Sequence, residues 1–125
     1  VAIGSRYIPH GEVSGWGPLR KCISRGGNLY ARAVLHIRTH DVTGGFNAWR
    51  REVLEAINYL SVSSKGYVFQ VELKYRALLK GYAISEIPIH FANRTLGKSK
   101  MSGSIFWEAA LHIWKLRNHL RRVPQ

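Results

Sequence analysis

Segments with a helical and with an extended pattern alternate along this chain, and the alternation limits the folds open to it. Extended segments are expected at residues 1–7, 46–49 and 87–91, and helices at 18–37, 50–57, 67–80 and from 104 onward. Strands that alternate with helices favour an α/β fold. The length of 125 residues allows one core, and a hydrophobic content of 46% argues against disorder.

Proline and glycine residues mark several boundaries of these segments. Pro18 suits the first position of a helix, and Gly81 stands where a left-handed residue would end one. Pro88 cannot donate a hydrogen bond to a neighbouring strand, so its segment is expected at a sheet edge. Gly26 and Gly27 lie inside the first long helix, where each costs about 1 kcal/mol relative to alanine. Close packing is expected beside them.

The first long helix shows one apolar and one polar face. Its apolar residues recur at close to the 3.6-residue period: Leu19, Cys22, Ile23, Leu29, Tyr30, Ala33, Val34 and Ile37. Arg20, Ser24 and Asn28 are spaced four apart and therefore stack along one side. They fit either a shared binding site for an anion or an ordinary solvated stripe.

Charge and cysteine content limit the kinds of partner and of site that this chain can have. The chain holds 19 Lys and Arg against 7 Asp and Glu, a net charge of +12, which predicts an anionic partner. Cys22 is the only cysteine, so no internal disulfide and no cysteine-based zinc site is expected. No apolar stretch reaches the length of a membrane span, which predicts a soluble or membrane-peripheral protein. Because the first residues read as a strand already under way, we expect a piece of a longer protein.

Two loops have the composition of anion-handling segments. Asp41, the only aspartate, precedes a Gly-Gly turn, and residues 94–101 combine three cations with two hydroxyls. A turn-forming aspartate and a solvated charge run are the simpler readings of the two loops. The six histidines lack nearby carboxylates in a ligand-like pattern, so no metal site is expected within this chain.

The last predicted helix is amphipathic over four turns. Its apolar stripe is Ile105, Ala109, Ile113, Leu116 and Leu120, widened by Phe106, Trp107 and Trp114; its polar stripe is Glu108, His112, Lys115, His119 and Arg122. The basic end favours the headgroup boundary of an anionic membrane. Packing against the rest of the domain fits the pattern equally well.

Five motifs in a fixed order give the most specific signal. They are GSRY at residues 4–7, Arg20 with Ser24 and Asn28, DVTGGF at 41–46 with Arg50, GYVFQVE at 66–72, and RTLGKSKM at 94–101. In this order and spacing the chain resembles the C-terminal half of the polyprenol (dolichol) phosphate mannosyltransferases, which are inverting GT-A glycosyltransferases. The resemblance implies the C-terminal part of a Rossmann-like GT-A domain at residues 1–103, followed by a basic amphipathic helix at 104–125.

The resemblance also assigns roles to individual residues. It implies that Arg6, Arg20 and Ser24 hold the acceptor phosphate, and that Arg94, Ser99 and Lys100 neutralise the leaving diphosphate. Asp41 lies on the acceptor-side loop, where a carboxylate would orient the sugar, a metal or an arginine. Gln70 and Glu72 are candidates for sugar or acceptor contacts. A favourable interaction of an acidic residue with the N-terminus of its helix is the plainer reading of Glu72.

The implied reaction transfers mannose from GDP-mannose to a polyprenyl or dolichyl monophosphate. The family's nucleotide-binding half, with its Asp-rich metal motif, would precede Val1. A divalent cation, Mg²⁺ or Mn²⁺, is therefore expected for the full enzyme, with ligands mostly outside this chain. The resemblance implies peripheral attachment to the cytoplasmic face of a membrane, with a membrane-anchoring subunit or domain as a further possible partner. Nucleic acid is not expected as a partner of such an enzyme.

Two other classes of function fit parts of the sequence. A small basic nucleic-acid-binding domain would use its charge together with Trp16, Trp49, Trp107 and Trp114 as stacking platforms. The tryptophans are not interleaved with basic residues in a recognisable reader motif. A membrane-surface binding module would act only through the helix at 104–122. Steep salt dependence of binding would identify the first class.

Overall fold

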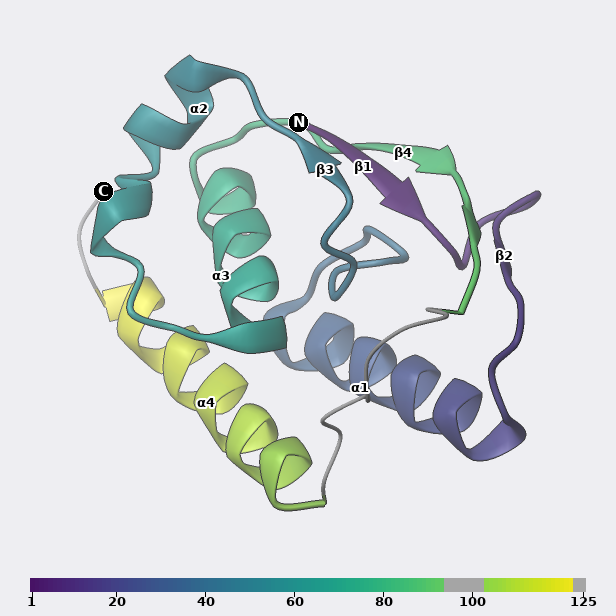
Figure 1. Ribbon diagram of the computed structural model, residues 1–125. Coiled ribbons are helices and arrows are strands. Elements are labelled where there is room, and N and C mark those ends of the chain that lie inside the picture. The colour runs from purple at the N-terminus through teal and green to yellow at the C-terminus, as the bar shows by residue number, and fades with distance from the viewer. Residues whose placement is uncertain (94–102, 123–125) are drawn as a thin grey trace.

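A computed structural model describes residues 1–93 and 103–122 of the chain and places a small sheet against a layer of helices (Figure 1). The sheet has the order β3–β1–β4, from Asn47–Ala48, Ala2–Ser5 and Ser85–Pro88. Strand β1 runs antiparallel to β3, with Ala2 opposite Ala48, and parallel to β4, with Ala2 opposite Ser85. The predicted mixture of helices and strands is confirmed.

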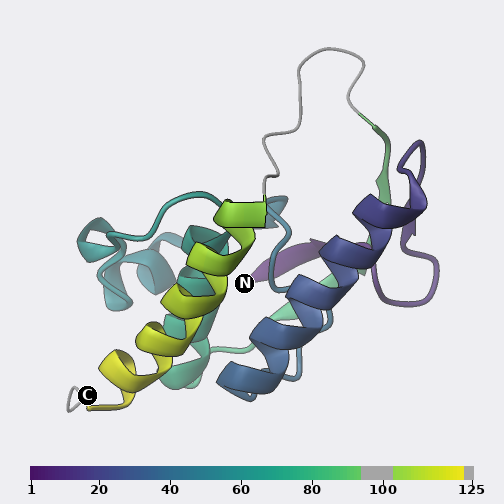
Figure 2. The same ribbon diagram turned by 90° about the horizontal axis from the view of Figure 1, so that it is seen from below.

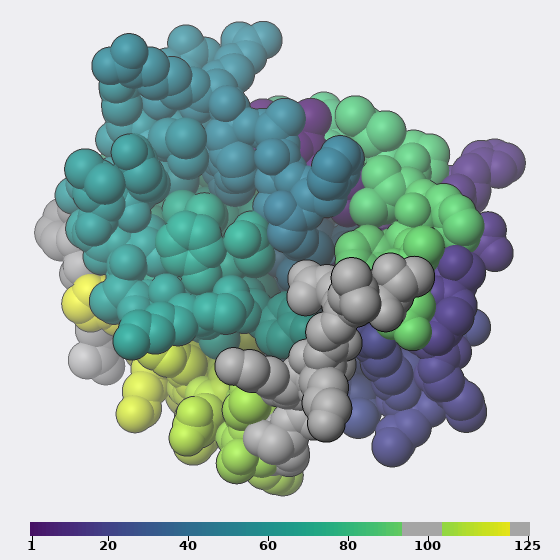
Figure 3. Space-filling model, in the orientation of Figure 1, coloured from purple at the N-terminus to yellow at the C-terminus, as the bar shows by residue number. Residues whose placement is uncertain are grey.

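The helices make up most of the described chain. They are α1 (Pro18–Leu35), α2 (Arg51–Ala56), α3 (Gly66–Leu79) and α4 (Gly103–Arg122), with a 3-10 turn, η1, at Tyr59–Ser61. Helix α4 packs against both α1 and α3, and Figure 2 shows α4 and α1 on the same side of the molecule. On the face seen in Figure 3, α2, η1 and α3 form the upper left, and α4 forms the lower left edge.

The ends of the long helices follow the sequence signals closely. Pro18 occupies the first turn of α1, as predicted. The helix ends at Leu35, two residues before the predicted end, because His36 adopts a left-handed conformation with φ of 55°. Helix α3 ends at Leu79, and Gly81 follows with φ of 80°, which confirms its predicted role in ending the helix.

The predicted strand at 87–91 is wrong in one respect, because the structure divides it in two. Strand β4 ends at Pro88 and pairs with β1 at the sheet edge, as its proline predicts. His90–Phe91 forms β5, which pairs in parallel with β2 at Glu12–Val13 in a second sheet. Strand β2 lies in a glycine-rich loop, and two residues are too few to show a strand period.

Two apolar clusters form the core. The larger joins α1, α3 and α4 through Ala31, Val34, Leu35, Ile37, Val42, Val68, Val71, Tyr75, Ile113 and Leu116. The smaller joins α2 to the other side of α3 through Val53, Ile57, Leu73 and Ala77. The two helical glycines differ in their surroundings. A Cβ atom added to Gly27 would lie 3.5 Å from the ring of Phe106 in α4, whereas one added to Gly26 would have no neighbour within 4 Å. The expectation of close packing is therefore confirmed only at Gly27.

One glycine of the sheet is required by its neighbours. A Cβ atom on Gly4 would approach side-chain atoms of Phe46 and Ile89 to 2.8–2.9 Å, closer than real Cβ contacts. Its backbone N–H donates to the carbonyl oxygen of Phe46 at 2.7 Å. Gly4 therefore lets the chain at Phe46 lie directly against β1, two residues before Arg6.

Candidate active site

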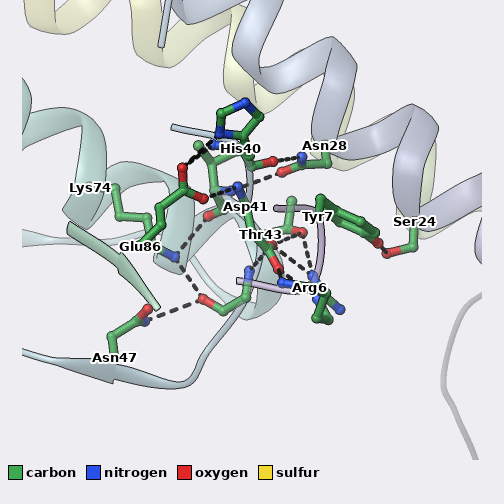
Figure 4. Close-up of polar contacts among 12 residues, drawn as sticks. Arg6, Tyr7, Ser24, Asn28, His40, Asp41, Thr43, Asn47, Lys74 and Glu86 are labelled. Atoms are coloured by element: carbon green, nitrogen blue, oxygen red, sulfur yellow. Dashed lines mark hydrogen bonds and ion pairs between the residues drawn. The ribbon is translucent and has the colours of Figure 1, made fainter. Parts of the chain in front are cut away.

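The carboxylate of Asp41 is fully buried and is held by an arginine from the end of β1 (Figure 4). Arg6 donates from Nε to Oδ2 at 2.7 Å and from Nη2 to Oδ1 at 2.8 Å, and its backbone N–H also donates to Oδ2 at 3.1 Å. This two-pronged geometry is the strong form of an arginine–carboxylate pair. Arg6 and Asp41 therefore act as one unit.

The same carboxylate shapes the turn that follows it. The backbone N–H of Gly44 donates to Oδ1 of Asp41 at 3.0 Å, and Arg6 Nη2 donates to the hydroxyl of Thr43 at 3.1 Å. A Cβ atom on Gly44 would lie 3.2 Å from Oδ1, so the turn is tight at this point. Asp41 combines the arginine contact and the turn-forming contact that the sequence suggested as alternatives.

Burial and pairing act on the protonation of both partners. Burial alone would raise the pKa of Asp41, but the hydrogen bonds and charge of Arg6 outweigh it and leave the pKa below its ordinary value. For Arg6, burial lowers the pKa, but the Asp41 carboxylate outweighs it and the pKa is raised. Both groups are charged at neutral pH.

A buried lysine that sequence reasoning missed binds the backbone of the loop that follows Asp41. Lys74 of α3 is fully buried, and its Nζ donates to the carbonyl oxygens of Val42 at 3.0 Å and Gly44 at 2.7 Å. Burial lowers its pKa to about 8, although the nearby Asp41 charge opposes the shift. A lysine inside a helical pattern normally faces solvent, so no feature of the sequence signals this contact.

Glu86 of β4 and Asn28 of α1 complete the support of the loop. Glu86 accepts hydrogen bonds from the backbone N–H groups of His40, at 2.9 Å, and Asp41, at 3.1 Å. Burial alone would raise the pKa of Glu86, but hydrogen bonds from the backbone and side chain of His40 outweigh burial and leave the pKa below its ordinary value. The Asn28 amide accepts from the N–H of Val42 at 2.8 Å and donates to the carbonyl of His40. Four elements thus hold residues 40–44, which we call the Asp41 loop.

The side chains predicted to hold the acceptor phosphate lie near one another on one side of this loop. The Arg20 guanidinium stacks on the Trp16 ring at 4.1 Å and donates to Asn93 Oδ1 at 3.0 Å. Ser24 shares a hydrogen bond of 2.5 Å with the hydroxyl of Tyr7. The Arg6 guanidinium lies 5.1 Å from the Tyr7 ring and 5.7 Å from the Trp16 ring. Two aromatic rings therefore connect Arg6, Arg20 and Ser24.

Asn28 does not belong to that group, contrary to the predicted stripe. Arg20 is partly buried and Ser24 faces Tyr7, whereas Asn28 is buried and both ends of its amide bind the Asp41 loop. Helical spacing predicts a shared side but not which neighbouring segment each side chain contacts. Asn28 supports the loop instead of presenting a free amide to an anion.

The two candidates on α3 lie in different surroundings. Gln70 lies next to the loop, where its Oε1 accepts from Nδ2 of Asn47 at 2.8 Å, and Asn47 also donates to the carbonyl of Gly44 at 3.2 Å. Glu72 is buried and pairs with Arg76 one turn later and with the Ser64 hydroxyl. Its helix begins at Gly66 and has no acidic residue in the first turn, so the reading of Glu72 as a helix N-terminal acid is wrong.

The remaining predictions concern the diphosphate contacts, a metal site, a membrane span and the tryptophans. Arg94, Ser99 and Lys100 lie outside the described residues. Among residues 1–93 and 103–122, no group of three or more His, Cys, Asp or Glu is placed to hold a metal ion. In the same part of the chain, no helix is long and apolar enough to cross a membrane. Two of the four tryptophans proposed as stacking platforms are packed, Trp16 against Phe91 and Arg20 and Trp49 against the smaller cluster.

Comparison with known proteins links this arrangement to two curated bacterial proteins. The chain is 47% identical over 125 residues to the polyprenol monophosphomannose synthase of Mycolicibacterium smegmatis, an alignment that covers 98% of this chain and 47% of that protein. It is 43% identical over 113 residues to the undecaprenyl-phosphate mannosyltransferase of Micrococcus luteus, covering 90% of this chain and 46% of that protein. No family model matches the chain. The chain spans about half the length of these relatives, and the matches confirm the resemblance drawn from the ordered motifs.

Proposed function

We propose that this chain, a homologue of the polyprenyl-phosphate mannosyltransferases over nearly its whole length, forms the acceptor side of such an enzyme. The full reaction would transfer mannose from GDP-mannose to a polyprenyl monophosphate with inversion, on a GT-A fold. The observation that carries the proposal is the 47% identity to a polyprenol monophosphomannose synthase across 98% of the chain. The proposed domain arrangement is the acceptor and diphosphate side at 1–103 and the basic helix at 104–125.

The chemistry needs positioning and charge compensation more than a strong base. A phosphate monoester is anionic near neutral pH, so it attacks the sugar once it is aligned and its charge is balanced. Arg20 suits this task because, within the described residues, its guanidinium has no carboxylate partner and bonds only to the neutral Asn93 side chain. Stacking on Trp16 fixes the guanidinium plane. Arg20 therefore supplies positive charge that the fold does not neutralise.

Arg6 and Ser24 would complete the contacts to the acceptor phosphate. Asp41 balances the charge of Arg6, but the two hydrogen bonds to the carboxylate use Nε and Nη2. In the part of the chain that the structure describes, no hydrogen bond uses Nη1 of Arg6. That group is free to donate to a phosphate oxygen, and the Ser24 hydroxyl can exchange Tyr7 for the same ligand.

The remaining candidates would act around the sugar and the leaving group. Asp41 would act through the loop it shapes and through Arg6, and Gln70 would face the sugar from beside Gly45. Glu72, which pairs with Arg76, is the weakest of the three as a substrate contact. Arg94, Ser99 and Lys100 would neutralise the leaving diphosphate.

A divalent cation, Mg²⁺ or Mn²⁺, belongs to the proposal for the full enzyme. The described residues do not fit a metal site, because Arg6 and the turn occupy both oxygens of Asp41. The ligands would therefore come mostly from outside this chain. We assign no step of the reaction to the cation here.

The proposed place of the enzyme is the cytoplasmic face of a membrane, attached peripherally, with or without a membrane-anchoring subunit or domain. The lipid acceptor motivates this location, because a polyprenyl chain partitions into the apolar part of a bilayer. The donor, GDP-mannose, is water-soluble and would reach the enzyme from the aqueous side.

The test is transfer of radiolabelled mannose from GDP-mannose to a short polyprenyl phosphate by the full-length protein with Mg²⁺ or Mn²⁺ present. We expect a mannolipid that mild acid cleaves. Arg20→Ala should raise the KM for the lipid phosphate at least tenfold and leave the KM for GDP-mannose within about twofold. Arg25→Ala, an exposed arginine of the same helix, is the matched control and should change neither.

The proposal would be overturned if the full-length protein formed no product with GDP-mannose, GDP-glucose or UDP-sugars. Equal effects of Arg20→Ala on both substrates would overturn the acceptor assignment. Binding to nucleic acid that falls steeply with added salt, without any sugar transfer, would favour the nucleic-acid-binding alternative.

A further inference from the structure

The second sheet ties the loop before α1 to strand β5. Strands β2 and β5 pair in parallel, with Val13 opposite Phe91. The pairing continues past β2, because the backbone N–H of Ser14 donates to the carbonyl of Phe91 at 3.0 Å. The Ser14 hydroxyl also shares a hydrogen bond of 2.9 Å with Nε2 of His90. Residues 14–16, which lead into α1, are therefore held by a segment far along the chain.

Asn93, two residues after β5, connects this loop to the Arg20 side chain. Its Nδ2 donates to the carbonyl of Gly15 at 3.1 Å, and its Oδ1 accepts from Nη1 of Arg20 at 3.0 Å. Gly15 has a φ of 73°, and a Cβ atom there would lie 2.8 Å from Cβ of Asn93. The loop backbone therefore lies directly against Asn93, and one neutral amide joins that backbone to the guanidinium.

The ring of Trp16 holds the same guanidinium by a second kind of contact. Cζ of Arg20 lies 4.1 Å from the centre of the ring, and Cζ of Arg6 lies 5.7 Å from it. The ring in turn packs edge-to-face with Phe91 of β5, at 5.6 Å between ring centres. Among the described residues, Nε of Arg20 is buried without a hydrogen-bond partner, and Asn93 alone accepts from the guanidinium. The fold thus orders Arg20 without balancing its charge.

We propose that Trp16 and Asn93 are positioning residues for the acceptor phosphate, because they hold the Arg20 guanidinium in place before the phosphate binds. A free arginine side chain has many rotamers, and a ligand that must order it binds more weakly. A stacked ring and a neutral amide supply this order in advance and leave the guanidinium charge available to the phosphate. The inference rests on the proposed function, since it takes Arg20 as a phosphate-binding group.

The test measures binding of a short, detergent-dispersed polyprenyl phosphate to the full-length protein by isothermal titration calorimetry. We expect Trp16→Leu and Asn93→Ala each to weaken binding by about fivefold or more. Trp16→Phe keeps an aromatic face for stacking and should bind within about twofold of the wild type. The matched control is Asn118→Ala, which removes an exposed amide on α4 and should bind like the wild type.

A double-mutant cycle distinguishes positioning from a merely structural role. If both residues act through Arg20, adding Trp16→Leu or Asn93→Ala to Arg20→Ala should weaken binding by less than about twofold further. Damage to the fold, or a direct contact with the phosphate, would instead add its full effect to that of Arg20→Ala. Asn93 is exposed, so Asn93→Ala keeps the cycle informative if Trp16→Leu fails to fold.

Calorimetry requires no sugar transfer, so this inference and the proposed function can fail separately. Non-additive losses of binding, in a protein that transfers no mannose, would support the positioning role and overturn the proposed function. Mannose transfer together with additive losses, or equal losses in Trp16→Phe and Trp16→Leu, would overturn the positioning role alone. Unchanged binding in both Trp16→Leu and Asn93→Ala would overturn it as well.

Discussion

The Asp41 loop and the exposed side of α4 formed by Trp107, Leu111 and Trp114 show opposite relations between the chemical nature of a side chain and its burial. Around the loop, Arg6, Asp41 and Lys74 are buried charged groups, and each has hydrogen-bonding partners at ordinary distances. Along α4, Trp107 and Trp114 are large apolar groups that stay in contact with solvent. Buried charges are tolerated when they are paired, whereas exposed apolar groups in a line indicate a surface that another molecule covers. The first region stabilises the fold, whereas the side chains of the second lie outside both core clusters of the described residues.

Asp41→Asn tests the loop side of this comparison and should have the largest effect. The substitution leaves the buried Arg6 charge without its anion, a loss expected at about 3–5 kcal/mol of unfolding free energy. Chemical denaturation followed by circular dichroism measures it. The control is Glu55→Gln, which breaks an exposed pair with Arg51 and should cost less than about 0.5 kcal/mol. Similar losses in both variants would contradict the assigned role of the buried pair.

A pair of leucines on α4 tests the other side of the comparison. Leu116→Ala removes a buried side chain and should cost about 2–4 kcal/mol, whereas Leu111→Ala should change stability by less than about 0.5 kcal/mol. The same denaturation experiment measures both. A large loss from Leu111→Ala would show that this side of α4 is covered within the protein, contrary to the 61% exposure of Leu111.

The pH dependence of stability tests whether Lys74 is charged in the folded protein. Its folded pKa of about 8 lies below the ordinary value of 10.5, so the unfolded chain binds more protons between these two values. The unfolding free energy from Lys74 should therefore rise with pH in this window, by at most about 1.4 kcal/mol per pH unit.

Lys74→Met lacks this titration and provides the reference. The stability difference between wild type and Lys74→Met should move in favour of the wild type as pH rises from about 8 to 10. Parallel stability curves across that range would show that Lys74 is not perturbed by burial. Lys65→Met is the control, an exposed lysine just before α3, and its curve should parallel the wild type.

Tyr7→Phe should have the smallest effect, since it removes one partly buried hydrogen bond to Ser24. We expect a loss of about 0.5–1.5 kcal/mol in unfolding free energy. In the transfer assay, freeing the Ser24 hydroxyl should change the KM for the lipid phosphate and leave that for GDP-mannose unaltered. A change in the GDP-mannose KM alone would separate Ser24 from the acceptor.

The sequence predicted the elements of the fold well, because their signals are local. The Pro18 helix start, the Gly81 helix end and the buried residues Ile113 and Leu116 all follow from spacing within one segment. The two-residue strands β2 and β5 escaped detection because pairing between distant segments creates them.

The candidate site was predictable only in part, for the same reason. Asp41 and Arg6 were singled out, but their ion pair joins residues 35 positions apart and has no signature in either segment. Lys74 and Glu86 were missed because a charged residue in a regular pattern normally faces water. Their burial depends on the carbonyl and N–H groups that the loop turns toward them.

The supports of the Asp41 loop also set the order in which the protein can assemble. Its contacts reach back 35 residues to Arg6 and forward 32 residues to Lys74 and 45 to Glu86. Closing such long segments is slow, because chain entropy is lost before the contacts form. During synthesis the loop leaves the ribosome well before Glu86 does. The Asp41 loop thus has Arg6 and Asn28 available when it is made, but waits for the supports that Lys74 of α3 and Glu86 of β4 add later.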